Sequence, residues 1–155
     1  MSTLAVIGVG KIGGEAAFVA ALEGLVDELV LYDVNIPLLQ AQVLDIQDCG
    51  LETRVSTETA GIREAEVCIY AAGVSRNPSI KTRADLLGIN LPIAETCLPL
   101  LKGFSGVFIT VTNPMDLLNY YFARNAGIPV ERCIGFGGQL DSARFRRILG
   151  ASGIA

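Results

Sequence analysis

The most informative stretch near the start of the chain is Leu4-Ala5-Val6-Ile7-Gly8-Val9-Gly10-Lys11-Ile12-Gly13. Its first four residues are apolar, rich in strand formers and too few for a helix, so they indicate a buried strand. Glycines at positions 8, 10 and 13 follow, and residues 11–25 then show helical spacing with many small side chains. The sequence therefore predicts a strand that enters a helix through a glycine-rich turn.

The turn fits the pattern G-x-G-x-x-G, in which Gly8 makes the tight turn, Gly10 admits a pyrophosphate and Gly13 lets the helix pack on the strand. The pattern alone is weak, because the chain contains 17 glycines. Asp33 strengthens it, since this residue ends the second expected strand, 20 positions after Gly13. A carboxylate there would accept hydrogen bonds from ribose hydroxyls and repel a 2′-phosphate, which favours NAD over NADP. A plain turn beside a surface Asp is the alternative.

Strands and helices alternate along the rest of the chain. We expect further strands at residues 28–33, 54–56, 67–71, 107–111 and 133–136, and helices at 36–48, 84–102, 115–126 and 141–149, with the second of these helices interrupted at Pro92 and Pro99. The alternation predicts βαβ units with right-handed crossovers. The fold class is α/β, a doubly wound parallel sheet of six strands in the order 3-2-1-4-5-6.

Composition excludes several classes of protein. With 51% hydrophobic and 18% charged residues the chain is not disordered, and a net charge of −4 offers no basic surface for nucleic acid or an anionic membrane. The longest uncharged stretch, residues 103–115, is too short to cross a membrane, so we expect a cytoplasmic protein. The four cysteines lack metal-ligand spacing, which predicts reduced thiols and no metal site. The chain contains no His.

Polar side chains follow the fourth and fifth expected strands, at the sheet edge where such folds bind ligands. Arg76 and Arg83 lie in the loop of residues 73–83, a candidate lid, and their guanidinium groups could hold carboxylates; a solvated loop is the alternative. Asn113 follows the fifth strand directly and precedes Pro114, with which it forms a candidate cis peptide. Asn113 could instead cap the next helix. Asp141 and Arg144 share one face of the last helix, where Asp141 could serve as the N-cap and pair with Arg144.

Five ordered motifs give the chain a family resemblance: Gly8 to Gly13 with Asp33, Ala72-Gly73-Val74-Ser75-Arg76, Thr82-Arg83-Ala84-Asp85 with Asn90, Val111-Thr112-Asn113-Pro114, and Gly137 to Arg146. The sequence resembles the lactate/malate dehydrogenase family over nearly its whole length, and most closely the archaeal malate dehydrogenases. One departure is the spacing from Arg76 to Arg83, which is one residue longer than in the malate enzymes.

The resemblance implies a role for each matching position. Gly8, Val9, Gly10, Lys11, Ile12 and Gly13 would hold the pyrophosphate of NAD and Asp33 its adenosine ribose, while Asn90, Val111, Thr112 and Asn113 would line the nicotinamide end. Arg83 would polarise the substrate carbonyl, Asn113 would touch the substrate, and Arg144 would grip the carboxylate beside that carbonyl. Arg76 would bind a second carboxylate, and Asp141 would orient a His that this chain does not contain.

The resemblance also implies an organisation and an activity. Residues 1–140 would form the dinucleotide-binding domain, and residues 141–155 the first helix and connector of a substrate domain that is otherwise missing. The parent enzyme would transfer hydride between malate and NAD in the tricarboxylic acid cycle as a homo-oligomer, a dimer or tetramer. Without His the chain alone should be inactive. A lactate-type 2-hydroxyacid dehydrogenase and a non-catalytic NAD-sensing module are the alternatives.

Overall fold

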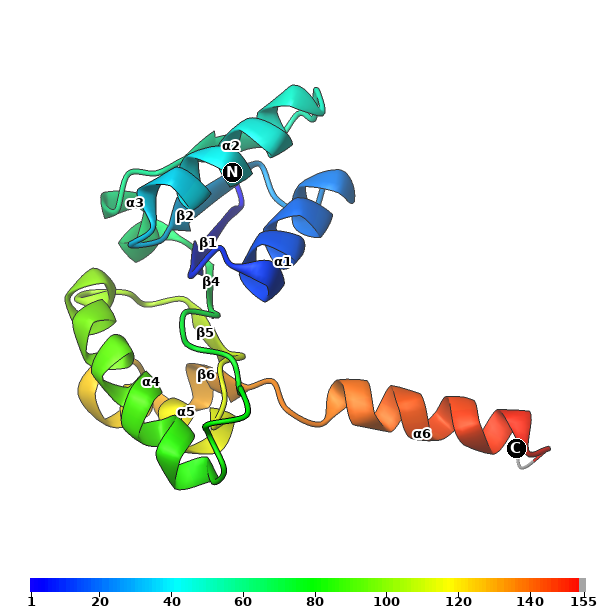
Figure 1. Cartoon of the computed structure of the whole chain (residues 1–155). Helices are drawn as coiled ribbons and strands as arrows, with labels where there is room; N and C mark the ends of the chain where they lie inside the picture. The colour runs from blue at the N-terminus through cyan, green and yellow to red at the C-terminus, as the bar shows by residue number, and fades with distance from the viewer. Residues whose placement is uncertain (154–155) are drawn as a thin grey trace.

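A computed structural model describes residues 1–153 of the chain. Its centre is a six-stranded sheet in which every neighbouring pair of strands is parallel, with the order β3-β2-β1-β4-β5-β6 (Figure 1). This confirms the predicted fold class and strand order. The strands are β1 (Thr3–Ile7), β2 (Glu28–Tyr32), β3 (Arg54–Ser56), β4 (Val67–Tyr70), β5 (Val107–Thr110) and β6 (Cys133–Gly135).

Helices cover both faces of the sheet. The helices are α1 (Lys11–Leu22), α2 (Ile36–Asp48), α3 (Ala60–Glu64), α4 (Arg83–Cys97), α5 (Met115–Asn125) and α6 (Gln139–Ala151), with short 3-10 helices η1 (Leu98–Leu101) and η2 (Val130–Arg132). One apolar core lies between α1, α2 and the sheet, and a second between the sheet and α3, α4 and α5. In the second core, the rings of Tyr70, Phe108 and Phe122 pack together.

Two expectations about the helices are wrong. The sequence analysis missed α3, a five-residue helix that buries only Ile62 and is too short to show a periodic pattern. It also placed a break at Pro92, whereas α4 runs through this residue without interruption. Pro92 is exposed, so the carbonyl group that loses its helical hydrogen bond faces water, which can replace that bond. Pro99, by contrast, does mark a change of structure, because it lies in the first turn of η1.

The order of the strands reverses between β1 and β4. The connections that follow these two strands leave toward opposite faces of the sheet, and in parallel sheets a crevice for ligands opens at such a point. The glycine-rich turn follows β1, and the segment containing Gly73, Val74 and Arg76 follows β4. The fold therefore brings two of the sequence motifs to the same edge of the sheet.

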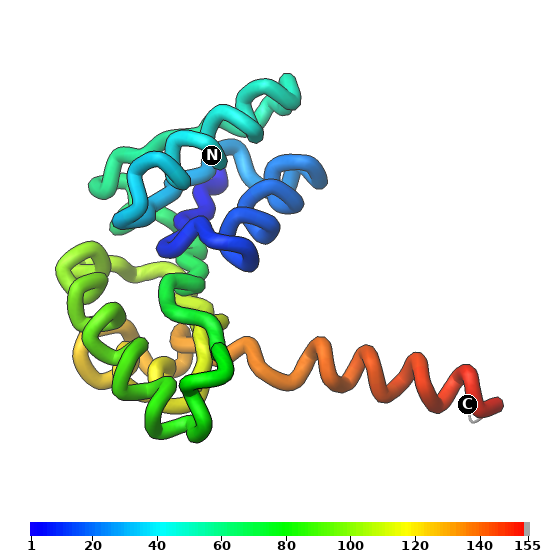
Figure 2. Tube along the Cα trace, viewed as in Figure 1, coloured from blue at the N-terminus to red at the C-terminus, as the bar shows by residue number. Residues whose placement is uncertain are grey.

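Helix α6 stands clear of the rest of the domain (Figures 1 and 2). None of its residues is buried, and Leu140, Phe145 and Ile148 expose their apolar side chains. The expected second segment, residues 141–155, falls within and after this helix; α6 begins two residues earlier, at Gln139, and residues 154 and 155 lie outside the described part of the chain.

One continuous stretch, Arg83–Leu101, is long and apolar enough by length and composition to cross a membrane. In the fold it packs against the sheet through Ala94, Cys97 and Leu101, as the core helix of a globular domain does. Within residues 1–153 no group of three or more His, Cys, Asp or Glu side chains is placed to hold a metal ion. The four cysteines are free: Cys68 and Cys97 are buried, and Cys49 is exposed.

Candidate functional site

The three glycines of the turn, Gly8, Gly10 and Gly13, have different structural roles. Gly8 has a φ of +90°, and a Cβ on it would lie 2.3 Å from the backbone nitrogen of Ala72. A Cβ on Gly13 would lie 1.8 Å from the carbonyl oxygen of Gly8, so the first turn of α1 rests directly on the end of β1. A Cβ on Gly10 would meet nothing within 4 Å. Gly8 and Gly13 therefore satisfy the packing of the protein, whereas Gly10 leaves open space at the start of α1.

Asp33 ties the end of β2 to this turn. One of its carboxylate oxygens, Oδ2, accepts a hydrogen bond from the N–H of Val9 at 2.9 Å, and Oδ1 accepts one from the N–H of Asn35 at 2.9 Å. Asn35 in turn caps α2 by accepting from the N–H of Leu38 at 3.2 Å. The carboxylate of Asp33 is thus held in a fixed orientation at the edge of the sheet, with lone pairs left for a ligand.

A cavity of about 520 Å³ lies beside Asp33 and the turn. Its walls include Gly8, Gly10 and Val34 on one side and Pro92, Ile93 and Thr96 of α4 on the other. Most of this surface is apolar, which suits a flat aromatic ring. Cys97 also borders the cavity, and burial raises the pKa of its thiol, so the group stays protonated and uncharged at neutral pH.

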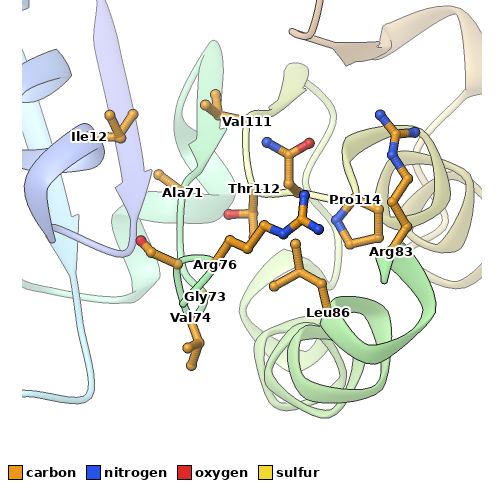
Figure 3. A pocket seen from close by; sticks show the side chains of 12 residues that line it. Ile12, Ala71, Gly73, Val74, Arg76, Arg83, Leu86, Val111, Thr112 and Pro114 are labelled. Carbon is orange, nitrogen blue, oxygen red and sulfur yellow. The ribbon is translucent and has the colours of Figure 1, made fainter. Parts of the chain in front are cut away.

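A second cavity of about 410 Å³ continues from the first, because Ala71, Gly73 and Val74 border both. Figure 3 shows that its lining combines Ile12 of the turn with Arg76, Arg83 and the segment Val111-Thr112-Asn113. The fold thus brings together the arginines and the asparagine that the sequence singled out, and none of the lining residues is acidic. The two cavities form one long groove whose second half suits an anion.

The two arginines of the second cavity are held differently. The guanidinium of Arg76 donates from Nε to the carbonyl oxygen of Ile80 at 3.3 Å and from Nη2 to that of Lys81 at 2.6 Å, so it is fixed by its own loop. Nη1 takes no part in these bonds. Arg83 lies at the border of the cavity beyond Pro114, where its Nη1 is 3.8 Å from Oδ1 of Asp116 on α5 (Figure 3). Both members of this pair are mostly exposed, so the pair stabilises little and Arg83 can move.

A capping box fixes the end of the loop that carries Arg76. The hydroxyl of Thr82 accepts from the N–H of Asp85, and the Asp85 carboxylate accepts from the N–H groups of Thr82 and Lys81. The hydrogen bond from the N–H of Thr82 is the main cause that lowers the pKa of Asp85 from its ordinary value. Arg83, the first residue of α4, is therefore attached to a well-anchored helix end.

Asn90 is held behind the wall of the cavities, and its expected contact with the coenzyme stays a prediction. This residue is 1% exposed and is not part of the lining of either cavity, because its amide hydrogen bonds to the backbone behind the wall. The alternative that Asn113 caps α5 is wrong, since the N-cap is Pro114 and no side chain caps that end. The peptide bond between Asn113 and Pro114 is cis, as the sequence suggested.

Asp141 and Arg144 lie apart from both cavities, on the projecting helix α6. Their side chains form the expected ion pair, with Nη1 of Arg144 3.0 Å from Oδ1 of Asp141. Asp141 is not the N-cap, because α6 begins at Gln139 with Gly138 as its cap. Residues 1–153 by themselves therefore do not bring Asp141 and Arg144 to Arg76 and Arg83.

The sequence analysis missed several residues that line the groove. Val34, Pro92, Ile93 and Thr96 border the cavity beside Asp33, and Asp116 pairs with Arg83 at the other end. Nothing in the sequence marks the apolar residues among these as part of a binding site, since apolar residues occur on many surfaces. Pro92 and Thr96 lie four positions apart on α4, a spacing that places both on one face, but nothing in the sequence says that this face meets the end of β2.

The strand order, the glycine-rich turn after β1 and the carboxylate after β2 together define a dinucleotide-binding domain of the Rossmann type. The chain matches the family model described as the NAD binding domain of lactate/malate dehydrogenase over residues 2–135. It belongs to the lactate/malate dehydrogenase family, and the matched part is the NAD-binding domain of that family.

Relatives from both branches of the family match the chain. It is 33% identical over 153 residues to a malate dehydrogenase of Flavobacterium johnsoniae, and 35% identical over 156 residues to an L-lactate dehydrogenase of a Geobacillus species. These matches cover 93% and 96% of this chain and 49% of each relative. The chain thus spans about half the length of these relatives. Both are bacterial, and the resemblance to archaeal malate dehydrogenases stays a prediction.

A solved structure of lactate dehydrogenase from Cryptosporidium parvum, complexed with lactic acid and NAD, superimposes with a TM-score of 0.87 at 31% identity. The superposition covers 99% of this chain and 51% of that one.

The groove fits NAD on the evidence of its own shape. The open space at Gly10 lies at the N-terminus of α1, whose free N–H groups and dipole favour a pyrophosphate. The carboxylate of Asp33 stands beside it for ribose hydroxyls, and the apolar cavity next to Asp33 suits adenine. The second cavity, which begins at Gly73, would take the nicotinamide end.

The glycines give a matched pair of variants. We expect Gly10→Ala to change the free energy of unfolding by less than about 1 kcal/mol, since its methyl group enters open space. The same methyl group occupies the space needed by the pyrophosphate, so the affinity for NAD⁺ should fall by about tenfold or more. Gly13→Ala should instead destabilise the fold by about 2 kcal/mol or more.

Urea unfolding and isothermal titration calorimetry measure the two effects. Equal losses of stability in both variants, or unchanged NAD⁺ affinity in a folded Gly10→Ala variant, would contradict this division of roles.

Proposed function

We propose that this chain is the coenzyme-binding half of a malate dehydrogenase, an enzyme that transfers hydride between malate and NAD. The observation that carries the proposal is the position of Arg76, whose guanidinium lies in the second cavity, at the nicotinamide end of the groove. A cation at this place matches a substrate that has a second carboxylate, which malate and oxaloacetate have and lactate and pyruvate lack. The expected cytoplasmic location and homo-oligomeric state stay predictions.

Different residues of the chain would bind different parts of the coenzyme and the substrate. Gly10, Lys11 and Ile12 would hold the pyrophosphate through backbone N–H groups, and Asp33 the adenosine ribose. NAD bound in this way would accept or return the hydride at the nicotinamide end. Asn113, Val111 and Thr112 form the cavity wall there, so the amide of Asn113 is available to hydrogen bond the substrate.

The two arginines would act on the substrate in different ways. Arg76 is fixed by the carbonyl groups of Ile80 and Lys81, and Nη1 remains to bind the second carboxylate. Arg83, which is paired only at 3.8 Å with an exposed Asp116, can exchange this partner for the substrate carbonyl oxygen. Its positive charge would then stabilise the negative charge that develops on that oxygen.

The chain supplies no general base for this reaction. Oxidation of malate requires a group that takes the hydroxyl proton near neutral pH, and the chain contains no His. Asp141 and Arg144, which the resemblance assigns to the His and to a substrate carboxylate, both lie on α6 away from the cavity. We therefore propose that the chain alone binds coenzyme without turnover.

The second candidate function is oxidation of a monocarboxylate such as lactate, because lactate dehydrogenases are among the similar sequences and structures. Arg76 favours malate, because its guanidinium matches a second carboxylate that lactate lacks. An NAD-sensing module without catalysis is the third candidate, and the kcat/KM measurement described below separates it from the other two.

We expect the chain to bind NADH more tightly than NADPH by about tenfold or more, on the order of 1.4 kcal/mol. The reason is that Asp33 would accept hydrogen bonds from the ribose hydroxyls and repel a 2′-phosphate. Calorimetric titration of both coenzymes measures the difference, and Asp33→Ser should narrow it. Equal affinities in the unmodified chain would contradict the role of Asp33.

The substrate preference depends on Arg76 and is measured in a catalytically complete protein, in which this chain is joined to the second half that its relatives possess. There, Arg76→Gln should lower the ratio of kcat/KM for oxaloacetate to kcat/KM for pyruvate by about 100-fold or more, since one desolvated carboxylate loses its cationic partner. An unchanged ratio would mean that another residue of the longer loop holds the second carboxylate.

The purified chain alone should form no NADH from malate above the rate without protein, because among residues 1–153 no His, Asp, Glu, Lys or Cys side chain lines the cavity to take the hydroxyl proton. Absorbance at the NADH band measures this rate. A rate above background that Asn113→Ala abolishes would show that the chain carries its own base, and the mechanism above would be wrong.

A further inference from the structure

One buried side chain hydrogen bonds both loops that form the second cavity. Asn90 lies in the middle of α4 and is 1% exposed. Its amide oxygen accepts from the N–H of Val74 at 2.7 Å, while its amide nitrogen donates to the carbonyl oxygen of Asn113 at 2.7 Å and to that of Val74 at 3.3 Å. Val74 follows β4 and Asn113 follows β5, so a single amide joins the two walls.

These bonds lie past the ends of β4 and β5, where the backbone hydrogen bonds of the sheet no longer connect the two segments. The last backbone bonds between them run from the N–H groups of Val111 and Thr112 to the carbonyl of Tyr70, at 2.9 and 3.4 Å. Next along the loops, the hydroxyl of Thr112 donates to the carbonyl of Ala72 at 2.9 Å. Farther out, Asn90 pairs with both the N–H and the C=O of Val74, as a residue of a neighbouring strand would.

The residues packed around Asn90 leave room for its hydrogen bonds to Val74. A Cβ on Gly73 would lie 3.1 Å from the amide oxygen of Asn90 and 2.5 Å from Cγ2 of Thr112. The missing side chain at position 73 thus leaves the space through which the amide reaches Val74. Leu86, Ala94 and Cys97, the other buried residues of α4, are apolar, so a polar residue at position 90 needs these hydrogen bonds to offset the cost of its burial.

We propose that Asn90 is a positioning residue, which fixes the Gly73-Val74 segment relative to Asn113 so that the nicotinamide end of the groove is formed before the coenzyme binds. It acts through the backbone of its two partners, because it lines neither cavity. The inference rests on the coenzyme binding proposed above. The family resemblance implied that Asn90 also contacts the nicotinamide end, and that contact stays a prediction beside this positioning role.

The groove allows a test in which one ligand is an internal control. AMP carries only the adenosine end of NAD⁺, and the cavity for that end is bordered by Asp33, Val34 and Ile93. Within that cavity's lining, Val74 is the residue that hydrogen bonds the Asn90 side chain, and Gly73 lies beside its amide. Loss of the Asn90 bonds should therefore weaken the binding of NAD⁺ much more than that of AMP, whereas a general loss of structure would weaken both.

The first variant is Asn90→Leu, which keeps the size of the side chain and removes every hydrogen bond. The affinity for NAD⁺ should fall by about tenfold or more, because backbone groups of both loops lose their partners. The affinity for AMP should stay within about twofold. Asp33→Ala is the matched control, since it should weaken both ligands alike. Unchanged NAD⁺ binding, or equal losses for the two ligands in Asn90→Leu, would overturn the proposal.

The second variant, Asn90→Asp, keeps the acceptor for the N–H of Val74 and loses both donor bonds while the carboxyl is ionised. Burial raises the pKa of such a carboxyl, so lowering the pH from about 8 to about 5 should protonate it and restore one O–H donor. The ratio of NAD⁺ affinity to AMP affinity should then recover in the variant and stay constant in the unmodified chain. A ratio independent of pH in the variant contradicts the proposal.

The unmodified chain gives a measurement that depends on no variant. The N–H of Val74 lies outside every strand and helix, yet it should exchange with solvent deuterium slowly, as the amides of β4 do. Exchange at the rate of an open loop would overturn the proposal. If the unmodified chain bound neither NAD⁺ nor AMP, the proposed function would fail, while slow exchange at Val74 would still establish that Asn90 holds the two loops.

Discussion

The contact between the backbone of Gly8 and the first turn of α1 determines where the rest of the site can lie. The helix approaches so closely that a single carbon atom on Gly13 would overlap the carbonyl oxygen of Gly8. This closeness brings the N-terminus of α1 to the end of β1, beside the crevice that opens where the strand order reverses. Asp33 then bonds the N–H of Val9, so the end of β2 is aligned with the same turn. Backbone packing and the Asp33 carboxylate thus place the proposed pyrophosphate and ribose sites side by side.

Helix α4 has the corresponding role for the other half of the groove. Its first turn carries the capping box of Thr82 and Asp85 and presents Arg83, and its middle holds Val74 and Asn113 through Asn90. Its next turn supplies Pro92, Ile93 and Thr96 to the cavity beside Asp33. One helix therefore connects the adenosine end of the groove to the substrate end. The segment that contains Arg76 is attached to this helix at both ends, through Val74 and through Thr82.

The sequence predicted the sheet, its strand order and most helices, because buried parallel strands are continuous apolar runs and the glycine-rich turn has a fixed chemistry. The sequence did not predict features that depend on which side of a helix faces water, or on helices too short to show a pattern. Pro92 is tolerated because it is exposed, and α3 is too short for a periodic pattern. The sequence also did not indicate the hydrogen bonds by which Asn90 holds the backbone behind the wall. The sequence places Arg76 and Arg83 close together in the chain, and in the structure both line the same cavity.

The central claim is that NAD lies along the groove from Asp33 to Asn113, and backbone chemical-shift mapping of the isotope-labelled chain during titration with NAD⁺ tests it most directly. The account predicts saturable shifts at Gly10, Lys11 and Ile12 for the pyrophosphate, at Asp33 and Val34 for adenosine, and at Val74 and Asn113 for the nicotinamide end. The amides of α6 should stay unchanged, since that helix lies apart from the groove. Shifts confined to α6, or none in the turn from Gly8 to Gly13 at saturating NAD⁺, would contradict the account.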